Sequence, residues 1–270
     1  MIENFTFKDR YTCEDLVRIV TLLRGPGGCP WDAEQTHESI RKNFIEETYE
    51  TIEAINKKDP AMLRDELGDV LLQILLHTEM EREKGVFDFD DVCDEISKKL
   101  IVRHPHVFGE VTVSSTDEVL TIWDAIKRAT KRQKTTTESI LSIPRELPAL
   151  MRAQKTQHKA AKAGFDWSEI SGAIDKIGEE TAEVKAALAE NDPDKIADEL
   201  GDLLFAAVNV CRFADVDAEE ALTAATDKFT ARFELVETYA RAAGKPIADF
   251  TEAQLDVFWE QAKKELKNRT

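Results

Sequence analysis

The feature that most constrains this chain is an internal repeat. Residues 46–73 and 179–206 align without a gap at a constant spacing of 133 residues and share 13 identities in 28 positions. Ordinary composition would give about two such identities by chance. Both copies contain the motifs Glu-Glu-Thr-x-Glu and Asp-Glu-Leu-Gly-Asp. The chain therefore consists of two copies of one structural unit, and each copy must fold around the same pattern.

Apolar residues in both copies recur with helical spacing. In the first copy the pattern is carried by Phe44, Tyr49, Ile52 and Ile55. Asp59 and Pro60 follow, and aspartate at an N-cap with proline at the first helical position favours the start of a helix. We expect this helix to bury Leu63, Leu67, Val70, Leu71 and Ile74, and the second copy to do the same with Val184, Leu188, Ile196, Leu200, Leu203 and Leu204. Two helices joined by so short a turn must run antiparallel.

The remaining pattern predicts an all-α fold. Further helices are expected around 90–103, 117–132, 217–241 and 251–267, and no segment alternates convincingly like a strand. The stretch before the second copy contains three threonines and two prolines, which is typical of a linker. We therefore predict two tandem helical-bundle domains, 1–134 and 151–270, joined by a linker at 135–150.

The charge balance excludes several classes of partner. The chain has 53 acidic and 36 basic residues, a net charge of −17. Such a field repels nucleic-acid backbones and anionic membranes, so we expect neither as a partner. An anionic small substrate would need local cations or a metal ion.

Cysteine usage and hydropathy favour the cytoplasm. The four cysteines (Cys13, Cys29, Cys93 and Cys211) have no paired spacing, so neither a zinc site nor a disulfide framework is indicated. No signal peptide is visible at the N-terminus. The longest apolar runs, 70–76 and 203–208, are far shorter than the roughly 20 residues of a membrane span. We expect a cytoplasmic, reducing setting.

The repeated acidic motifs can converge in space. A helix turns about 100° per residue, so Glu47 and Glu50 lie on one face, and Glu66 and Asp69 have the same spacing on the partner helix. In an antiparallel hairpin these four carboxylates can meet. Two ionised carboxylates about 4 Å apart repel by about 4 kcal/mol at an effective dielectric of 20, so the cluster requires a cation. Oxygen-only ligands suit Mg²⁺ or Mn²⁺, which commonly share their coordination with substrate phosphates.

The second copy repeats this cluster with Glu180, Glu183, Glu199 and Asp202. Glutamates at such spacings are also common on solvated helix faces. Here, however, neighbouring surface positions differ between the copies, for example Arg64 against Ala197, whereas every carboxylate persists. We therefore interpret both clusters as metal-binding.

Cations near the second cluster indicate what the metal ion serves. Lys176 lies four residues before Glu180, on the same helical face. Lys228 and Arg232 form an i, i+4 pair on the next helix, and Trp259 and Lys263 form another one helix later. An aromatic ring beside cations suits a nucleotide, because the ring stacks on the base and the cations meet phosphates. Comparable places in the first copy hold Lys99, Arg103, Trp123 and Lys127.

These motifs resemble those of a known family. Glu-Glu-x-x-Glu followed after a short turn by Glu-x-x-Asp resembles the signature of the all-α nucleoside triphosphate pyrophosphohydrolases, and two tandem copies resemble the MazG proteins. The resemblance covers nearly the whole chain and includes the segments 28–32 (Gly-Cys-Pro-Trp-Asp), 104–108 and 147–153. It implies Mg²⁺-dependent hydrolysis of nucleoside triphosphates to monophosphates and pyrophosphate by dimeric helical bundles. The second copy departs from the first at 164–167 (Gly-Phe-Asp-Trp).

The resemblance also implies roles for individual residues. The four carboxylates of each copy hold the metal ion. The expected nucleotide-binding residues are Lys176, Glu180, Lys195, Asp198, Asp202, Lys228, Arg232, Trp259 and Lys263. The expected catalytic residues are Glu179, Glu180 and Glu183, with Glu179 as orienter or general base for the attacking water.

The two copies differ in positive charge. Asn43 and Met62 stand in the first copy where Lys176 and Lys195 stand in the second. A triphosphate brings several negative charges, so we predict that the C-terminal site carries most of the turnover. A metal-binding hairpin that is open on one side needs cover, and we therefore expect a homodimer; the alternative is a monomer in which the two copies cover each other.

Two alternative interpretations differ from this one in class. A helical regulatory protein would bind nucleoside triphosphates with Mg²⁺ but release no pyrophosphate. A di-iron carboxylate protein is suggested by Glu34-x-x-His37, although this pattern occurs once and outside the repeated hairpin. Turnover distinguishes the first alternative, and iron absorption distinguishes the second.

Overall fold

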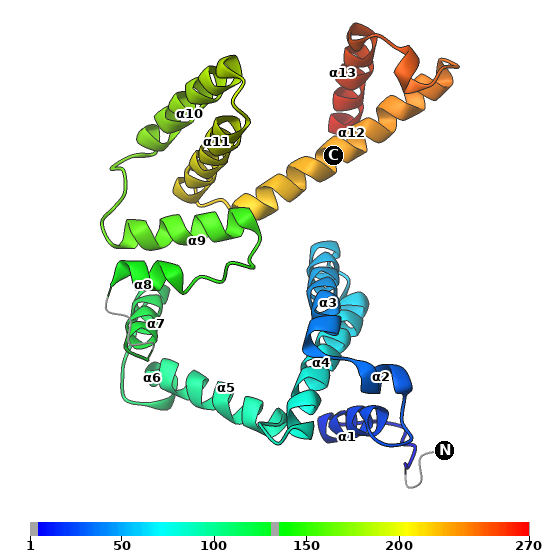
Figure 1. Cartoon of the computed structure of the whole chain (residues 1–270), viewed down its shortest axis with the longest axis vertical. Coiled ribbons are helices and arrows are strands. Elements are labelled where there is room, and N and C mark those ends of the chain that lie inside the picture. Colours follow the sequence, from blue (N-terminus) through cyan, green and yellow to red (C-terminus); the bar gives the residue numbers. More distant parts are fainter. Residues whose placement is uncertain (1–4, 131–134, 270) are drawn as a thin grey trace. The chain divides into compact units, whose positions relative to one another are not determined.

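The computed structural model describes residues 5–130 and 135–269 (Figure 1). Within these ranges helices are the only regular secondary structure, so the predicted all-α fold is confirmed. The chain forms two compact units, Met1–Thr130 and Lys131–Thr270. The domain boundary predicted at residue 134 lies outside the described residues.

The first unit contains the helices α1 (Cys13–Arg24), α2 (Pro30–Glu34), α3 (His37–Lys57), α4 (Pro60–Glu83), α5 (Phe89–Arg103), α6 (Pro105–Phe108) and α7 (Thr116–Thr130). The second contains α8 (Thr136–Leu141), α9 (Ala149–Lys162), α10 (Ile170–Glu190), α11 (Pro193–Phe213), α12 (Ala218–Ala242), the short 3₁₀ helix η1 (Ile247–Asp249) and α13 (Glu252–Arg269). The four additional helices predicted from the sequence correspond to α5, α7, α12 and α13. No described helix is long and apolar enough to cross a membrane.

Each unit contains a long helical hairpin, formed by α3 and α4 in the first unit and by α10 and α11 in the second (Figure 1). The Asp59 side chain begins α4 by accepting hydrogen bonds from two backbone N–H groups of its first turn, at 2.9 and 3.1 Å. Asp192 begins α11 in the same way, at 3.1 and 3.3 Å. Lys58 and Asn191 adopt the left-handed conformation with φ of 54°, which ends the preceding helix. The repeated sequence therefore encodes the repeated turn.

Two helices that the sequence analysis did not anticipate support these hairpins. α1 packs against α4, and α9 packs against α11 and α12. The buried core of the first unit is formed by Val20 of α1, Ile40 of α3, and Leu75, Leu76 and Met80 of α4. Thr12 begins α1 with a capping box in which Asp15 is the reciprocal partner. That Thr-x-x-Asp pattern was a sequence signal for α1.

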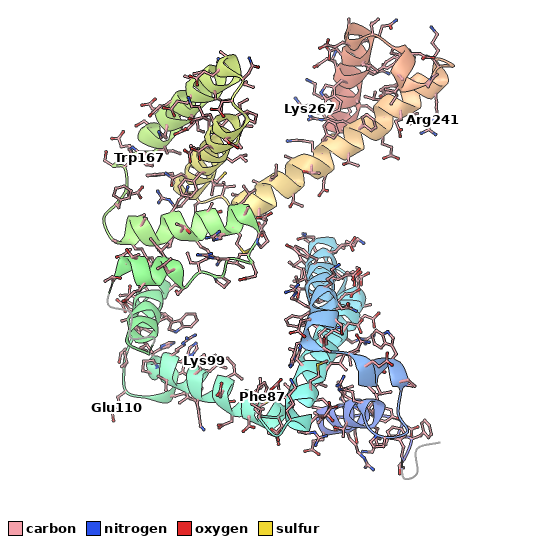
Figure 2. The ribbon with its side chains drawn as sticks, viewed as in Figure 1. Phe87, Lys99, Glu110, Trp167, Arg241 and Lys267 are labelled. Carbon is pink, nitrogen blue, oxygen red and sulfur yellow. The ribbon has the colours of Figure 1, made fainter. Side chains whose placement is uncertain are left out.

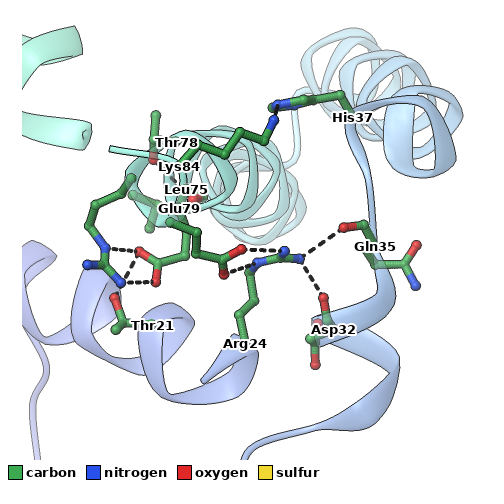
Figure 3. Close-up of polar contacts among 11 residues, drawn as sticks. Thr21, Arg24, Asp32, Gln35, His37, Leu75, Thr78, Glu79 and Lys84 are labelled. Atoms are coloured by element: carbon green, nitrogen blue, oxygen red, sulfur yellow. Dashed lines mark hydrogen bonds and ion pairs between the residues drawn. The ribbon is translucent and has the colours of Figure 1, made fainter. Parts of the chain in front are cut away.

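A polar network fixes α1 and α2 on α4 (Figure 3). The Arg24 guanidinium donates to both carboxylate oxygens of Glu83, at 2.8 and 3.0 Å, and to the backbone carbonyls of Asp32 (2.5 Å) and Gln35 (3.2 Å). The Arg24 side chain is only 5% exposed. A buried arginine with these four acceptors links α1, α2 and α4, in addition to the apolar packing of α1 on α4.

Many apolar side chains of the hairpins are exposed, which corrects the predicted core. Leu67 of α4 is 51% exposed and Leu204 of α11 is 59% exposed, although both were expected to be buried. Phe44, Tyr49, Ile52, Ile55, Leu188 and Leu200 are also exposed. The helical periodicity was correct, but the described residues of each unit leave these hairpin faces exposed.

The segment predicted to be a linker, 135–150, contains α8 and the first residues of α9. α8 packs against α9, and the Lys159 ammonium of α9 donates to the Ser139 side chain of α8 at 2.9 Å. Thr135 and Pro148 in this segment therefore occupy the N-cap positions of α8 and α9 in the second unit. Thr135, for example, begins α8 with a capping box.

Candidate metal centre and nucleotide site

Acidic side chains converge on the α10–α11 hairpin of the second unit. Glu180 of α10 and Glu199 and Asp202 of α11 each offer one carboxylate oxygen within 4.8 Å of the others. The i, i+3 spacing places Glu199 and Asp202 on the face of α11 that meets α10. Such a group can hold a metal ion through oxygen ligands.

Glu180 is the most deeply buried member of this group. Its side chain is 3% exposed, and its Oε2 atom is buried without a hydrogen-bond partner. Its Oε1 atom lies 2.5 Å from the Lys176 ammonium, which also contacts Glu179 at 2.9 Å. These two carboxylates raise the pKa of Lys176 above its ordinary value, so the ammonium remains charged.

Glu183 is exposed and lies outside the group of three. The adjacent Glu180 carboxyl, partial loss of solvent and the nearby charge of Glu199 raise the pKa of Glu183. It is therefore close enough to the cluster to interact with it electrostatically. The structure brings three of the four expected ligands together and places the fourth beside them.

The first unit contains the matching group on its α3–α4 hairpin. Glu47, Glu66 and Asp69 each offer an oxygen within 4.8 Å of the others. Burial and the charges of Asp69 and Glu50 raise the pKa of Glu47, and burial and the charge of Glu50 raise the pKa of Glu66. Desolvation, followed by repulsion between neighbouring carboxylates, accounts for these two pKa shifts.

The expected base-stacking residues form a second group on α12 and α13. The guanidinium carbon of Arg232 lies 5.6 Å from the ring centre of Trp259. The ring of Phe229 lies 5.2 Å from that of Trp259. The Arg232 Nε atom is buried without a hydrogen-bond partner. Sequence reasoning missed Phe229, although its position next to Lys228 and three residues before Arg232 placed it near this face.

The two groups lie on separate helical pairs of the second unit. α12 extends beyond the α10–α11 hairpin, and α13 folds back along its distal part, near the end marked by Arg241 (Figures 1 and 2). Among the described residues, no hydrogen bond or ion pair links Lys228, Arg232 or Trp259 to the carboxylate group. The sequence alone could not predict the separation between the carboxylate group and the Arg232–Trp259 group, because it depends on the direction in which α12 leaves the bundle.

The other expected nucleotide-binding residues lie at exposed positions or in local ion pairs. Lys195 pairs with Glu190 across the hairpin turn, and Lys263 pairs with Glu260 on α13. Asp198 is exposed on α11. Lys195 and Asp198 therefore lie along the same helix as Glu199 and Asp202, and Lys263 lies one turn from Trp259.

The segment before α10 explains the departure of 164–167 from the first copy. The Asp166 carboxylate pairs with Arg212 of α11 at 2.5 Å. The Trp167 ring lies directly against Gly172 of α10, where a Cβ atom would clash with it. Gly172 is therefore required for this close approach, and the tryptophan fixes the start of α10.

The Glu34-x-x-His37 pattern does not form the helical motif of a di-iron site. Glu34 ends α2 and His37 begins α3, so the two residues do not lie on one continuous helix. His37 instead contacts His77, with 2.7 Å between their Nδ1 atoms, and Glu81, with 2.6 Å between Nε2 and Oε1. This cluster ties the start of α3 to the end of α4.

The fold and its two acidic hairpins define a duplicated all-α protein with carboxylate groups suited to a metal ion. The sequence profile described as "MazG nucleotide pyrophosphohydrolase domain" matches residues 35–108 and 170–236, just over half of the chain. Each matched segment contains one hairpin and its three-carboxylate group.

Relatives extend this similarity over the full chain. The nucleoside triphosphate pyrophosphohydrolase of Escherichia coli K12 is 44% identical over 93% of this chain and 96% of its own length. The Thermotoga maritima protein named nucleoside triphosphate pyrophosphohydrolase/pyrophosphatase MazG is 44% identical over 93% of this chain and 95% of its own length. The uncharacterized protein YabN of Bacillus subtilis is 46% identical over 91% of this chain and 50% of its own length.

The chain belongs to the MazG nucleotide pyrophosphohydrolase family and is a hydrolase that acts on phosphoric anhydrides. The family resemblance inferred from the sequence is therefore confirmed. This membership favours an enzyme over the alternative of a nucleotide sensor without turnover.

Proposed function

We propose that the chain hydrolyses nucleoside triphosphates to nucleoside monophosphates and pyrophosphate, with Mg²⁺ as cofactor and Mn²⁺ as an alternative. The observation that carries this proposal is the group of Glu180, Glu199 and Asp202, with a buried Glu180 next to a charged Lys176. The substrate class is supported by two relatives, named as nucleoside triphosphate pyrophosphohydrolases, that align over nearly their whole length.

The carboxylate group suits a hard divalent cation. A buried carboxylate oxygen without a donor, such as Glu180 Oε2, is unfavourable unless a cation satisfies it. Glu180, Glu199 and Asp202 would hold the ion, and Glu183 lies close enough to join them. When bound, Mg²⁺ would neutralise charge on phosphate oxygens and polarise the attacking water.

The chain's own residues then perform binding, orientation and proton transfer. Water attacks the α-phosphorus, the bond from that phosphorus to the bridging oxygen breaks, and pyrophosphate leaves with the electron pair. Lys176 and Lys195 contact the phosphates, and Glu179 orients the water and accepts its proton. Trp259 stacks on the base, a contact that tolerates any base.

We further propose that the C-terminal site carries most of the turnover. Both units retain the three carboxylates, so metal ligands do not distinguish them. Asn43 and Met62 replace the two lysines in the first unit. Each phosphate contact from a charged group contributes about 1.5–3 kcal/mol. Losing two such contacts would destabilise the transition state enough to lower the rate of pyrophosphate release about 10²-fold or more.

We also propose that the active form is a homodimer. Large apolar side chains on both hairpins are 40–60% exposed, including Ile55 (54%), Leu188 (53%) and Leu204 (59%). Patches of this kind are usually covered in the functional protein. A second copy provides a matching apolar face through two-fold symmetry, and closed pairing avoids filaments.

Product analysis tests the proposed reaction most simply. The purified chain is incubated with each ribo- and deoxynucleoside triphosphate and Mg²⁺, and the products are identified by ³¹P NMR. We expect equal amounts of nucleoside monophosphate and pyrophosphate, no products in EDTA, and recovery when Mg²⁺ is restored. Nucleoside diphosphate with orthophosphate would contradict the proposed bond cleavage.

A further inference from the structure

Lys176 forms an ion pair with Glu180, a carboxylate of the proposed metal centre. Its ammonium lies 2.5 Å from Glu180 Oε1 and 2.9 Å from Glu179 Oε1. The Glu180 side chain is 3% exposed, whereas those of Lys176 and Glu179 are 35% and 58% exposed. The partly exposed Lys176 side chain therefore extends to the buried Glu180 carboxylate and serves as its counterion.

A metal ion at this group needs the same carboxylate. Mg²⁺ binds oxygen ligands at about 2.0–2.1 Å, so an ion on Glu180 and an ammonium on the same carboxylate would lie within a few ångströms of each other. Two cations at this distance repel, and burial of Glu180 limits screening by water and salt. The lysine and the metal ion therefore compete for Glu180.

The first unit provides the comparison without this competitor. Asn43 stands on α3 at the position of Lys176, four residues before Glu47. Glu47, Glu66 and Asp69, like their counterparts in the second unit, each offer a carboxylate oxygen within 4.8 Å of the others. The two groups thus offer the same carboxylates with and without a lysine counterion.

We propose that Lys176 is a positioning residue that weakens metal binding at the C-terminal site until a triphosphate draws its ammonium away from Glu180. This inference rests on the proposed function, because the metal ion and the triphosphate are those of the proposed reaction. The phosphate oxygens offer Lys176 a new anionic partner, and the positive charge that repels the ion moves away from Glu180 at the same time. Nucleotide and metal ion therefore promote each other's binding, as linkage requires.

The consequence is a difference between the two sites in the absence of nucleotide. The N-terminal group binds a divalent ion without a competing charge, whereas the C-terminal group binds it weakly. The C-terminal centre is then assembled mainly when substrate is present. With this arrangement, the C-terminal site would polarise a water molecule only while a triphosphate is bound for that water to attack.

Mn²⁺ titration of the full chain without nucleotide tests this inference, with binding followed by calorimetry or electron paramagnetic resonance. Asp69→Asn removes a ligand of the first site, so that the second site is measured. Asp202→Asn removes a ligand of the second site, so that the first site is measured. Lys176→Asn is made in the Asp69→Asn parent, and Asn43→Lys in the Asp202→Asn parent. Lys185→Asn, which removes an exposed lysine elsewhere on α10, is the charge-matched control.

We expect Lys176→Asn to raise Mn²⁺ affinity about tenfold and Asn43→Lys to lower it about tenfold. The Lys185→Asn control should change affinity by less than about twofold. Pyrophosphate release by Lys176→Asn in the otherwise unaltered chain should fall, because the phosphates lose a contact. A structural lesion would lower both metal affinity and turnover, so tighter metal binding with slower turnover is specific to the proposed role.

Unchanged or weaker Mn²⁺ binding by Lys176→Asn, in a chain that still releases pyrophosphate, would overturn this inference and leave the proposed function intact. Absence of Mn²⁺ binding in both parents, together with absence of pyrophosphate release by the unaltered chain, would overturn the proposed metal centre as well.

Discussion

Arg232 combines a contact over the Trp259 ring with a buried Nε atom that has no hydrogen-bond partner. An unpaired guanidinium N–H beside an aromatic ring suits a phosphate or base acceptor. We predict that Arg232→Ala raises KM for nucleoside triphosphates by about tenfold or more, since a charge-assisted contact is lost. Arg241→Ala, at the far end of α12 and 76% exposed, is the control. Equal KM values in both variants would contradict this role.

His77 makes the first unit sensitive to acid. Burial and the neighbouring His37 lower the pKa of His77 below its ordinary value. The unfolded chain therefore takes up a proton near pH 6.5 that the folded state resists, and stability falls as the pH drops below that value. His77→Val introduces the residue found at position 210 of the second copy. We predict that, between pH 7.5 and 5.5, this variant loses less free energy of unfolding in urea than the unaltered chain does. An unchanged pH dependence would contradict this account.

Residue spacing was sufficient to predict the carboxylate groups but not their surroundings. The i, i+3 pairs and the antiparallel turn require Glu180, Glu199 and Asp202 to meet, and they do. The predicted burial of Leu67 and Leu204 was wrong because periodicity identifies an apolar face without saying which molecule covers it. The ion pair of Lys176 with Glu179 follows from i, i+3 spacing, yet only the structure shows that Glu180 is the buried partner.

The Asp-Pro pairs determine where the second helix of each hairpin begins. Asp192 accepts hydrogen bonds from two N–H groups of α11 that would otherwise be unpaired. We predict that Asp192→Ala lowers the free energy of unfolding by about 1 kcal/mol, whereas Asp192→Asn, which retains a capping oxygen, changes it much less. Chemical denaturation of the three proteins measures this difference. Equal destabilisation by both variants would show that the cap is not the cause.

The helix starts at the repeated Asp-Pro pairs were predicted, whereas the supporting helices α1 and α9 were not. The helices after Asp59 and Asp192 begin at Pro60 and Pro193, as the Asp-Pro pattern indicated. α1 was missed because its Thr12 capping signal was not used, and α9 follows Pro148 without a side-chain cap. The division of the second unit into α10–α11 and α12–α13 follows from packing of α12 on α9, which is a long-range contact without a local sequence pattern.

At the scale of the whole molecule, the exposed apolar faces of the hairpins lead us to predict self-association. We predict that light scattering gives twice the mass of one chain at micromolar concentration. Leu204→Lys should shift the population toward single chains, because it places a charge on the proposed interface. Phe7→Lys, at an 85% exposed residue outside the hairpins, should not. A mass of one chain for the unaltered protein would contradict the dimer.

The most direct test of the account compares matched metal-ligand variants of the two units. Glu199 and Glu66 occupy equivalent positions in the two carboxylate groups. We predict that Glu199→Gln lowers the rate of pyrophosphate release by about 10²-fold or more, whereas Glu66→Gln lowers it by less than about threefold. Pyrophosphate release from a nucleoside triphosphate is the measurement, with circular dichroism to verify that both variants are folded. An equally severe loss in Glu66→Gln would contradict the claim that the C-terminal site carries the turnover.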